Sequence, residues 1–271
     1  MCEFCISHGE GKKWYKNMTN YTRELFLQVS TDKKLKNYLN NFGQSMKDGL
    51  ARSEKWERRI PHIYSFLISP WITHHLKKIH FGQVVPIEDV EYILDGVSSV
   101  VRLPCICRKI NSGVEARVCY AVGMDATQIL KDIPDFKEFD RITAAEAKKE
   151  MRGLDTEGLS HSVWTFQTPF IGAVCNCDQN CMAYLIQYQK NLAKVMWKGE
   201  YVAIIEQDRC KGCRQCLKRC PFDAVHYDRG LEKCRIEIRN CYGCGICRPT
   251  CPEDAIALLE RKNVTLAANS W

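Results

Sequence analysis

The chain repeats one pattern of four cysteines twice, first as Cys210-Lys-Gly-Cys213-Arg-Gln-Cys216-Leu-Lys-Arg-Cys220-Pro221 and then as Cys241-Tyr-Gly-Cys244-Gly-Ile-Cys247-Arg-Pro-Thr-Cys251-Pro252. Each copy has the spacing C-x2-C-x2-C-x3-C-P, which is typical of chains that hold [4Fe–4S] clusters. One pair of cysteines would also fit zinc, a redox pair or chance. Two complete runs closed by proline favour iron–sulfur chemistry over a pair of zinc ribbons, because zinc does not require the third and fourth thiol in this register.

The spacing also predicts which thiols act together. In such runs the first three cysteines bind one cluster, and the fourth binds the other cluster. The predicted ligand sets therefore cross. The first set is Cys210, Cys213, Cys216 and Cys251, and the second is Cys241, Cys244, Cys247 and Cys220.

Residues 201–261 resemble a dicluster bacterial-type ferredoxin. The segment Glu206-Gln-Asp-Arg-Cys210 and the two Cys-Pro-(Phe/Glu)-Asp-Ala-(Val/Ile) tails carry the resemblance. It covers less than a quarter of the chain and implies a βαββαβ unit that encloses two [4Fe–4S] clusters. With mixed helix and strand patterns before it, the predicted fold class is α+β.

The length of 271 residues allows more than one domain. We expect a helical region at residues 1–81, a mixed, cysteine-rich domain at 82–199, the ferredoxin domain at 200–262 and a tail at 263–271. The 17 cysteines, without a secretory leader pattern, predict metal-bound thiolates in a reducing cytoplasm. Oxygen-sensitive clusters suggest an anaerobic setting, and the absence of a long apolar run predicts no integral membrane segment.

The formal net charge of +7 is no argument for a nucleic-acid partner. Each cluster with four thiolates carries about −2, so two clusters bring the net charge to roughly +3. Lys and Arg are also spread along the chain without a long basic tract, which favours a solvated surface.

Helix and strand signals precede the cysteine runs. Apolar spacing predicts a helix or a broken pair over residues 19–41, a stop at Gly43 and further helix over 46–59. Helices are also expected at 87–94, at 143–152 after a capping-box pattern, and at 182–197. Strands are expected at 97–103, 159–166 and 170–174.

Six further cysteines follow predicted strands and are candidates for an additional centre: Cys105, Cys107, Cys119, Cys175, Cys177 and Cys181. The motifs Pro104-Cys105-Ile-Cys107-Arg108, Glu157-Gly158-Leu159-Ser160-His161 and Cys175-Asn176-Cys177 resemble uncharacterised ferredoxin-like proteins of anaerobes. We expect a third iron–sulfur cluster here, with zinc or redox-active thiols as alternatives. Arg108 is placed to lower a thiolate pKa or to bond a sulfide.

Three cysteines remain. Cys2 and Cys5 are a candidate half-site for metal, and Cys234 is expected to be an ordinary buried thiol.

The leading functional expectation is an electron carrier: a multi-cluster ferredoxin that serves as a subunit or dedicated partner of an anaerobic redox enzyme. One alternative is a reductase whose N-terminal metal site binds a substrate or cofactor and is fed by the ferredoxin domain. Another is a redox or metal sensor. No G-x-G-x-x-G, P-loop or nucleophile elbow is present, so the sequence assigns no catalytic residue.

Overall fold

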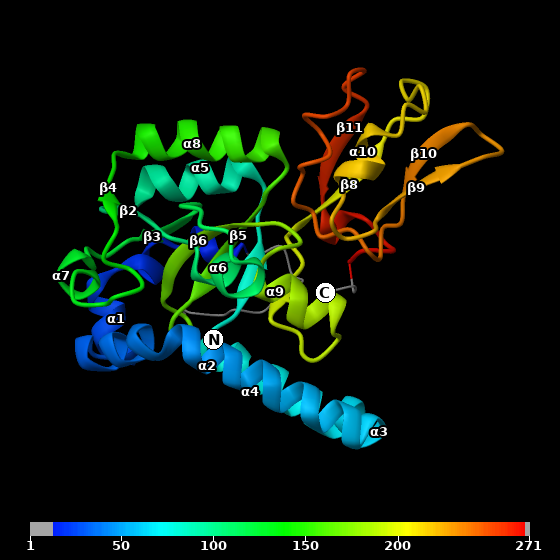
Figure 1. Ribbon diagram of the computed structural model, residues 1–271. Coiled ribbons are helices and arrows are strands. Elements are labelled where there is room, and N and C mark those ends of the chain that lie inside the picture. The colour runs from blue at the N-terminus through cyan, green and yellow to red at the C-terminus, as the bar shows by residue number, and fades with distance from the viewer. Residues whose placement is uncertain (1–12, 269–271) are drawn as a thin grey trace.

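The computed structural model describes residues 13–268, and it places a mixed sheet with its helices beside a smaller cysteine-rich unit (Figure 1). We call residues 13–199 the N-terminal unit and residues 200–268 the C-terminal unit. The sheet of the N-terminal unit has seven strands in the order β4-β2-β3-β6-β5-β1-β7. Its pairs are antiparallel except for β1 with β7. The strands are β1 (Gly82–Val84), β2 (Val100–Leu103), β3 (Cys119–Val122), β4 (Asp140–Arg141), β5 (Ser160–Thr165), β6 (Ile171–Cys177) and β7 (Met196–Trp197).

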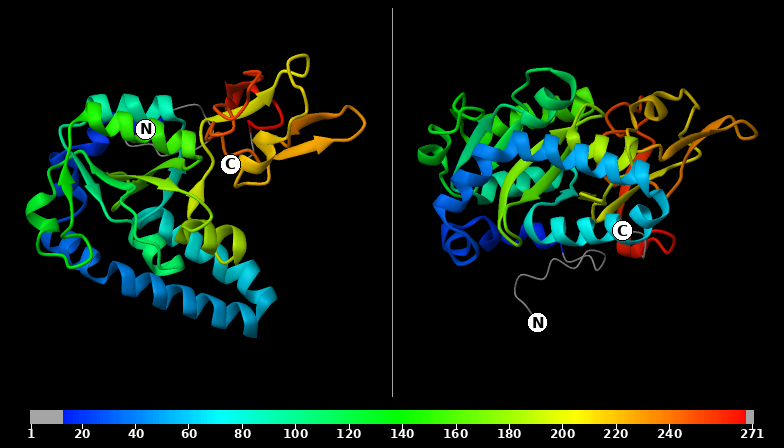
Figure 2. Two further views of the ribbon diagram at one scale, coloured as in Figure 1. Left: turned by 45° about the horizontal axis from the view of Figure 1, so that its top comes forward. Right: turned by 60° about the horizontal axis from the view of Figure 1, so that its bottom comes forward.

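Helices cover both faces of this sheet, as the views of Figure 2 show. On one face, α5 (Ile87–Gly96) and α8 (Ala144–Glu157) bury apolar side chains against Val100, Tyr120 and Val174. The other face carries α1 (Arg23–Val29), α2 (Asp32–Arg59), α6 (Ile106–Ser112) and α7 (Thr127–Leu130). The remaining helical segments before β1 are η1 (Trp14–Lys16), η2 (Met18–Tyr21), α3 (Pro61–Ile63), the π-helical η3 (Tyr64–Ile68) and α4 (Ser69–Ile79).

The predicted capping box is confirmed at the start of α8. The Thr143 side chain accepts the Glu146 backbone N–H, and the Glu146 carboxylate accepts the Thr143 N–H. This pair satisfies two of the donors that a helix start leaves open. At its other end, α8 closes on Gly158 in the left-handed conformation, with φ of 92°.

The predicted helix stop at Gly43 is wrong, because α2 runs through this glycine to Arg59. Gly43 is buried, and a Cβ atom there would lie 3.4 Å from Ile110 Cδ1 of α6. That distance is an ordinary van der Waals contact, so the packing of α2 on α6 does not by itself require glycine at this position.

The predicted helix over 182–197 is also wrong beyond its first two turns. Only α9 (Met182–Tyr184) and the π-helical η4 (Leu185–Gln189) form. The backbone N–H groups of Val195 and Met196 donate to the side-chain oxygen of Gln187. These bonds turn the chain into β7, which completes the sheet beside β1. The pairing of β7 with β1 therefore outweighs the helical spacing of apolar residues in 182–197.

The C-terminal unit consists of two small antiparallel sheets. Strand β8 (Tyr201–Ile205) pairs with β11 (Ile256–Glu260), and β9 (Val225–Asp228) pairs with β10 (Lys233–Ile236). One short helix, α10 (Gln215–Arg219), follows the first cysteine triplet, and η5 (Arg261–Asn263) follows β11. The structure differs from the predicted βαββαβ order at the second helix, because residues 247–250 form turns.

The two units share a small apolar core. Val84 and Met196 from the large sheet pack with Phe222, Tyr242 and Cys244 of the C-terminal unit. Polar contacts surround this core. Arg248 forms a two-pronged ion pair with Glu88 at 2.7 and 2.9 Å, and Arg219 donates to the carbonyl oxygens of Thr156 and Glu157 at the end of α8.

Candidate iron–sulfur site

Two cavities in the C-terminal unit are each lined by four cysteines of the doubled motif. Three of the four come from one run and the last comes from the other run. The first cavity has Cys210, Cys213, Cys216 and Cys251, and the second has Cys241, Cys244, Cys247 and Cys220. Their empty volumes, which include space open to solvent, are similar at about 320 and 310 Å³. These are the two groupings that the spacing predicts.

The residues that line the two cavities are related by a shift of 31 positions in the sequence. Cys241, for example, stands 31 residues after Cys210. The same shift relates Lys211 to Tyr242 and Glu253 to Phe222, and each of these residues lines its own cavity. Lys211 and Glu253 are exposed, whereas Tyr242 and Phe222 are buried and stacked, with ring centroids 4.3 Å apart. The first cavity therefore faces solvent, and the second faces the N-terminal unit.

The loops around the cavities need backbone conformations that favour glycine. Gly212 and Gly243 occupy equivalent places in the two runs and have φ of 66° and 72°. A Cβ atom on Gly243 would overlap the carbonyl oxygen of Tyr201, and one on Gly212 would overlap the carbonyl oxygen of Glu232. The glycines thus let each loop lie against the neighbouring backbone, where a side chain would not fit.

Backbone N–H groups also point at cysteine sulfurs. Ala203 N–H donates to Cys241 Sγ and Ala255 N–H donates to Cys251 Sγ, each at 3.3 Å. Burial raises the pKa of the Cys216 thiol to about 12 and raises the pKa of Cys244 well above its usual range. A free thiolate is therefore costly at these positions, and iron supplies the positive charge that stabilises it. The residues fit a [4Fe–4S] group in both cavities.

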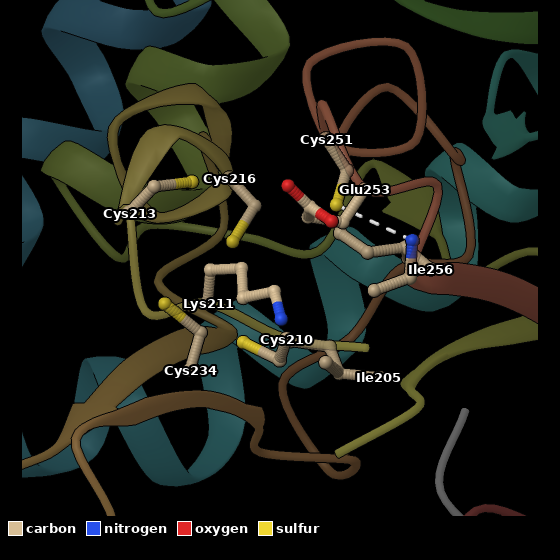
Figure 3. A pocket seen from close by; sticks show the side chains of 10 residues that line it. Ile205, Cys210, Lys211, Cys213, Cys216, Cys234, Cys251, Glu253 and Ile256 are labelled. Carbon is tan, nitrogen blue, oxygen red and sulfur yellow. Dashed lines mark hydrogen bonds between the residues drawn. The ribbon is translucent and has the colours of Figure 1, made fainter. Parts of the chain in front are cut away.

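Figure 3 shows the first cavity from close by and reveals a side chain that the sequence analysis did not assign to it. Cys234 on β10 lines the cavity together with the four motif cysteines and is 1% exposed. The expectation of a buried thiol is correct as far as burial goes. The cysteine spacing does not predict its place in this cavity, which it lines together with Cys216.

The six cysteines of the N-terminal unit gather on one face of the large sheet. Cys119 and Cys175 lie directly opposite each other on β3 and β6. Cys119 is close enough to interact with both Cys105 and Cys175, and Cys181 is close enough to interact with both Cys105 and Cys177. Cys107 interacts electrostatically with Cys105, Cys175 and Cys177. Sheet pairing and the starts of α6 and α9 thus bring together thiols that lie far apart in sequence.

A buried cation lies beside this six-thiol cluster. Arg108 is 5% exposed and forms an ion pair with Asp178 at 3.0 Å. Its charge interacts with Cys105 and Cys181, and within residues 13–268 its Nε has no hydrogen-bond partner. Hydrogen bonds from Cys119 and Cys181, together with Arg108, lower the pKa of the Cys105 thiol. A buried guanidinium with an open N–H suits an anionic occupant, such as a thiolate-bound cluster.

Other predicted residues lie outside the cluster. His161 of the quoted Glu-Gly-Leu-Ser-His segment is fully buried, with Nδ1 2.5 Å from Asn176 Oδ1. Because strand residues alternate between faces, both point away from the face that carries Cys175 and Cys177. Cys2 and Cys5 lie outside the described residues. Within residues 13–268, no three His, Cys, Asp or Glu side chains are arranged to hold a single metal ion.

Comparison with known families supports the C-terminal assignment. Residues 209–256 match the family model described as a 4Fe-4S dicluster domain. A comparison of the chain with curated proteins gave no match. The family match begins after the six-thiol cluster, so the resemblance of residues 82–197 to ferredoxin-like proteins of anaerobes stays a prediction.

Proposed function

We propose that this chain is an electron-transfer protein that holds two [4Fe–4S] clusters in its C-terminal unit. The observation that carries the proposal is the match of residues 209–256 to a 4Fe-4S dicluster domain, together with two cavities that each present four thiols. A cubane held by four thiolates accepts and releases one electron at a time.

The proposed ligands are the cysteines that line each cavity. Cys210, Cys213, Cys216 and Cys251 would hold the first cluster, and Cys241, Cys244, Cys247 and Cys220 would hold the second. The glycine turns bring backbone close to both sites, and the N–H bonds of Ala203 and Ala255 direct donors at the ligand sulfurs. Such bonds tune the reduction potential of an iron–sulfur centre.

We also propose a third iron–sulfur centre in the six-thiol cluster, with zinc as the alternative. The mutual contacts of the thiols and the buried charge of Arg108 support it. One cubane needs four thiolate ligands, so the six thiols are enough to hold one. In a reducing compartment, clustered thiols do not form stabilising disulfides. Metal binding therefore explains better than disulfide formation why six thiols lie together.

The proposed context is a redox partner protein or a complex in the cytoplasm of an anaerobe. The exposed Cys213 and Lys211 leave the first cavity accessible to such a partner, while the second cavity is covered by the N-terminal unit. In the described part of the chain, no helix is long and apolar enough to cross a membrane.

Metal and sulfide analysis of the full chain, purified without oxygen, tests the proposal. We expect at least about eight iron and eight sulfide per chain from two clusters, and about twelve of each if the third centre is a cubane. Replacement of Cys177 by Ala should then remove the excess over eight and leave the other two centres unchanged. Stoichiometric zinc without sulfide would contradict the electron-transfer assignment.

A further inference from the structure

The first cavity contains five cysteines, whereas the second contains four. The 31-residue shift that relates the cavities places Cys234 in the first at the position that Ala203 occupies in the second. Both positions lie on strands of the C-terminal unit, and both side chains are buried, at 1% and 3% exposure. The repeat therefore offers an internal comparison, in which one cavity has a thiol and its counterpart has a methyl group.

The extra thiol is held in a defined position. Cys234 lies in register with Tyr227 of β9, and its carbonyl oxygen accepts the Gln207 side-chain amide at 3.1 Å. The Cys234 and Cys216 side chains both line the first cavity and are close enough there to influence each other electrostatically. Figure 3 shows Cys234 and Cys216 among the side chains around the cavity.

A hydrogen bond between Cys234 and Cys216 can have only one direction once a cluster is bound. A cysteine that binds iron has lost its proton, so the Cys216 sulfur can only accept. The remaining proton of the pair belongs to Cys234. A fifth ligand is not needed, because Cys210, Cys213, Cys216 and Cys251 already complete the set that the second cavity forms without any thiol at position 203.

We propose that Cys234 is a positioning residue whose thiol donates a hydrogen bond to the Cys216 sulfur and raises the reduction potential of the first centre. The inference rests on the proposed function, since it concerns the cluster that Cys216 would hold. A donor to a ligand sulfur stabilises the more negative, reduced form of a cluster, which makes reduction easier. No proton is transferred in this step, because the thiol keeps its proton while the centre gains one electron.

The charged groups near the two cavities also differ, but variants at residue 234 do not change them. Lys211 and Glu253 line the first cavity with opposite charges. Arg261 donates to the Cys241 carbonyl oxygen beside the second cavity, and it interacts with the buried Glu200. These groups stay the same when residue 234 is changed, so variants at this position isolate the contribution of the thiol.

The test compares the full chain with its Cys234→Ala, Cys234→Ser and Ala203→Cys variants, using iron content and anaerobic redox titrations followed by EPR. Cys234→Ala should keep all its iron, lower the potential of one centre and leave the other potential unchanged. Cys234→Ser keeps a donor of similar size and should restore most of that shift. Ala203→Cys should instead raise the potential of the other centre.

Several results would overturn the inference. Unchanged potentials in Cys234→Ala would show that the thiol does not influence the centre. Loss of about four iron in both Cys234 variants would show that Cys234 is a ligand. One potential that responds to changes at both 234 and 203 would contradict their placement in separate cavities. Wild-type protein without iron or sulfide would instead refute the proposed function, which is a distinct outcome.

Discussion

Paired cysteine replacements can separate crossed from uncrossed ligand sets. Cys220 belongs to the same sequence run as Cys210, yet it lines the second cavity with Cys241. With crossed sets, Cys220→Ala/Cys241→Ala removes two ligands from one centre, so the chain should lose about four iron and one [4Fe–4S] EPR signal. Cys210→Ala/Cys220→Ala removes one ligand from each centre, so both signals should be lost.

The design controls for fold and for partial occupancy. Each double variant removes two cysteines and both share Cys220→Ala, so a general loss of stability affects them similarly. Spin quantification distinguishes intact [4Fe–4S] centres from three-iron remnants, and iron bound elsewhere contributes the same background to both. The reverse pattern, in which the Cys210/Cys220 pair spares one centre and the Cys220/Cys241 pair destroys two, would show that each run binds its own cluster.

Three further outcomes follow from local geometry. Thr143→Ala removes the cap of α8 and should lower the free energy of unfolding by about 1 kcal/mol in chemical denaturation. Gly123→Ala should cost roughly 1–3 kcal/mol, because φ is 94° and the new Cβ would overlap the Tyr21 carbonyl oxygen; the open helical site of Gly153 should tolerate the same change without loss of stability. Arg108→Gln removes the buried cation beside the six thiols and should reduce iron above about eight per chain, with no change in the two dicluster EPR signals.

The features that the sequence predicts best are those with a local physical cause. The doubled cysteine spacing predicts the grouping of thiols that the two cavities display, because a short loop fixes which sulfurs face one centre. The capping box is likewise contained in residues 143–146, and its two hydrogen bonds form as expected. Strands β5 and β6 also lie where β-branched and aromatic residues predict them.

The features that were missed depend on contacts between distant segments. Gly43 disfavours a helix by local propensity, but α2 continues through it, where it is buried against Ile110 of α6. The pairing of β7 with β1 likewise replaces a helix that local spacing favours. Cys234 belongs to no cysteine run, so only the 31-residue comparison with Ala203 could have indicated its place in a cavity.

Aromatic side chains form a series of contacts between α9 and the second cavity. Cys181 of the six-thiol cluster precedes α9, on which Tyr184 stacks with Tyr188 at 5.0 Å between ring centroids. Tyr188 in turn lies 5.6 Å from the rings of both Phe222 and Tyr242, which line the second cavity. These ring contacts lead from Tyr184 to the second cavity. In the function that we propose, the exposed first centre is the one open to a redox partner, and the second is the one that packs on Val84 and Met196 of the N-terminal unit.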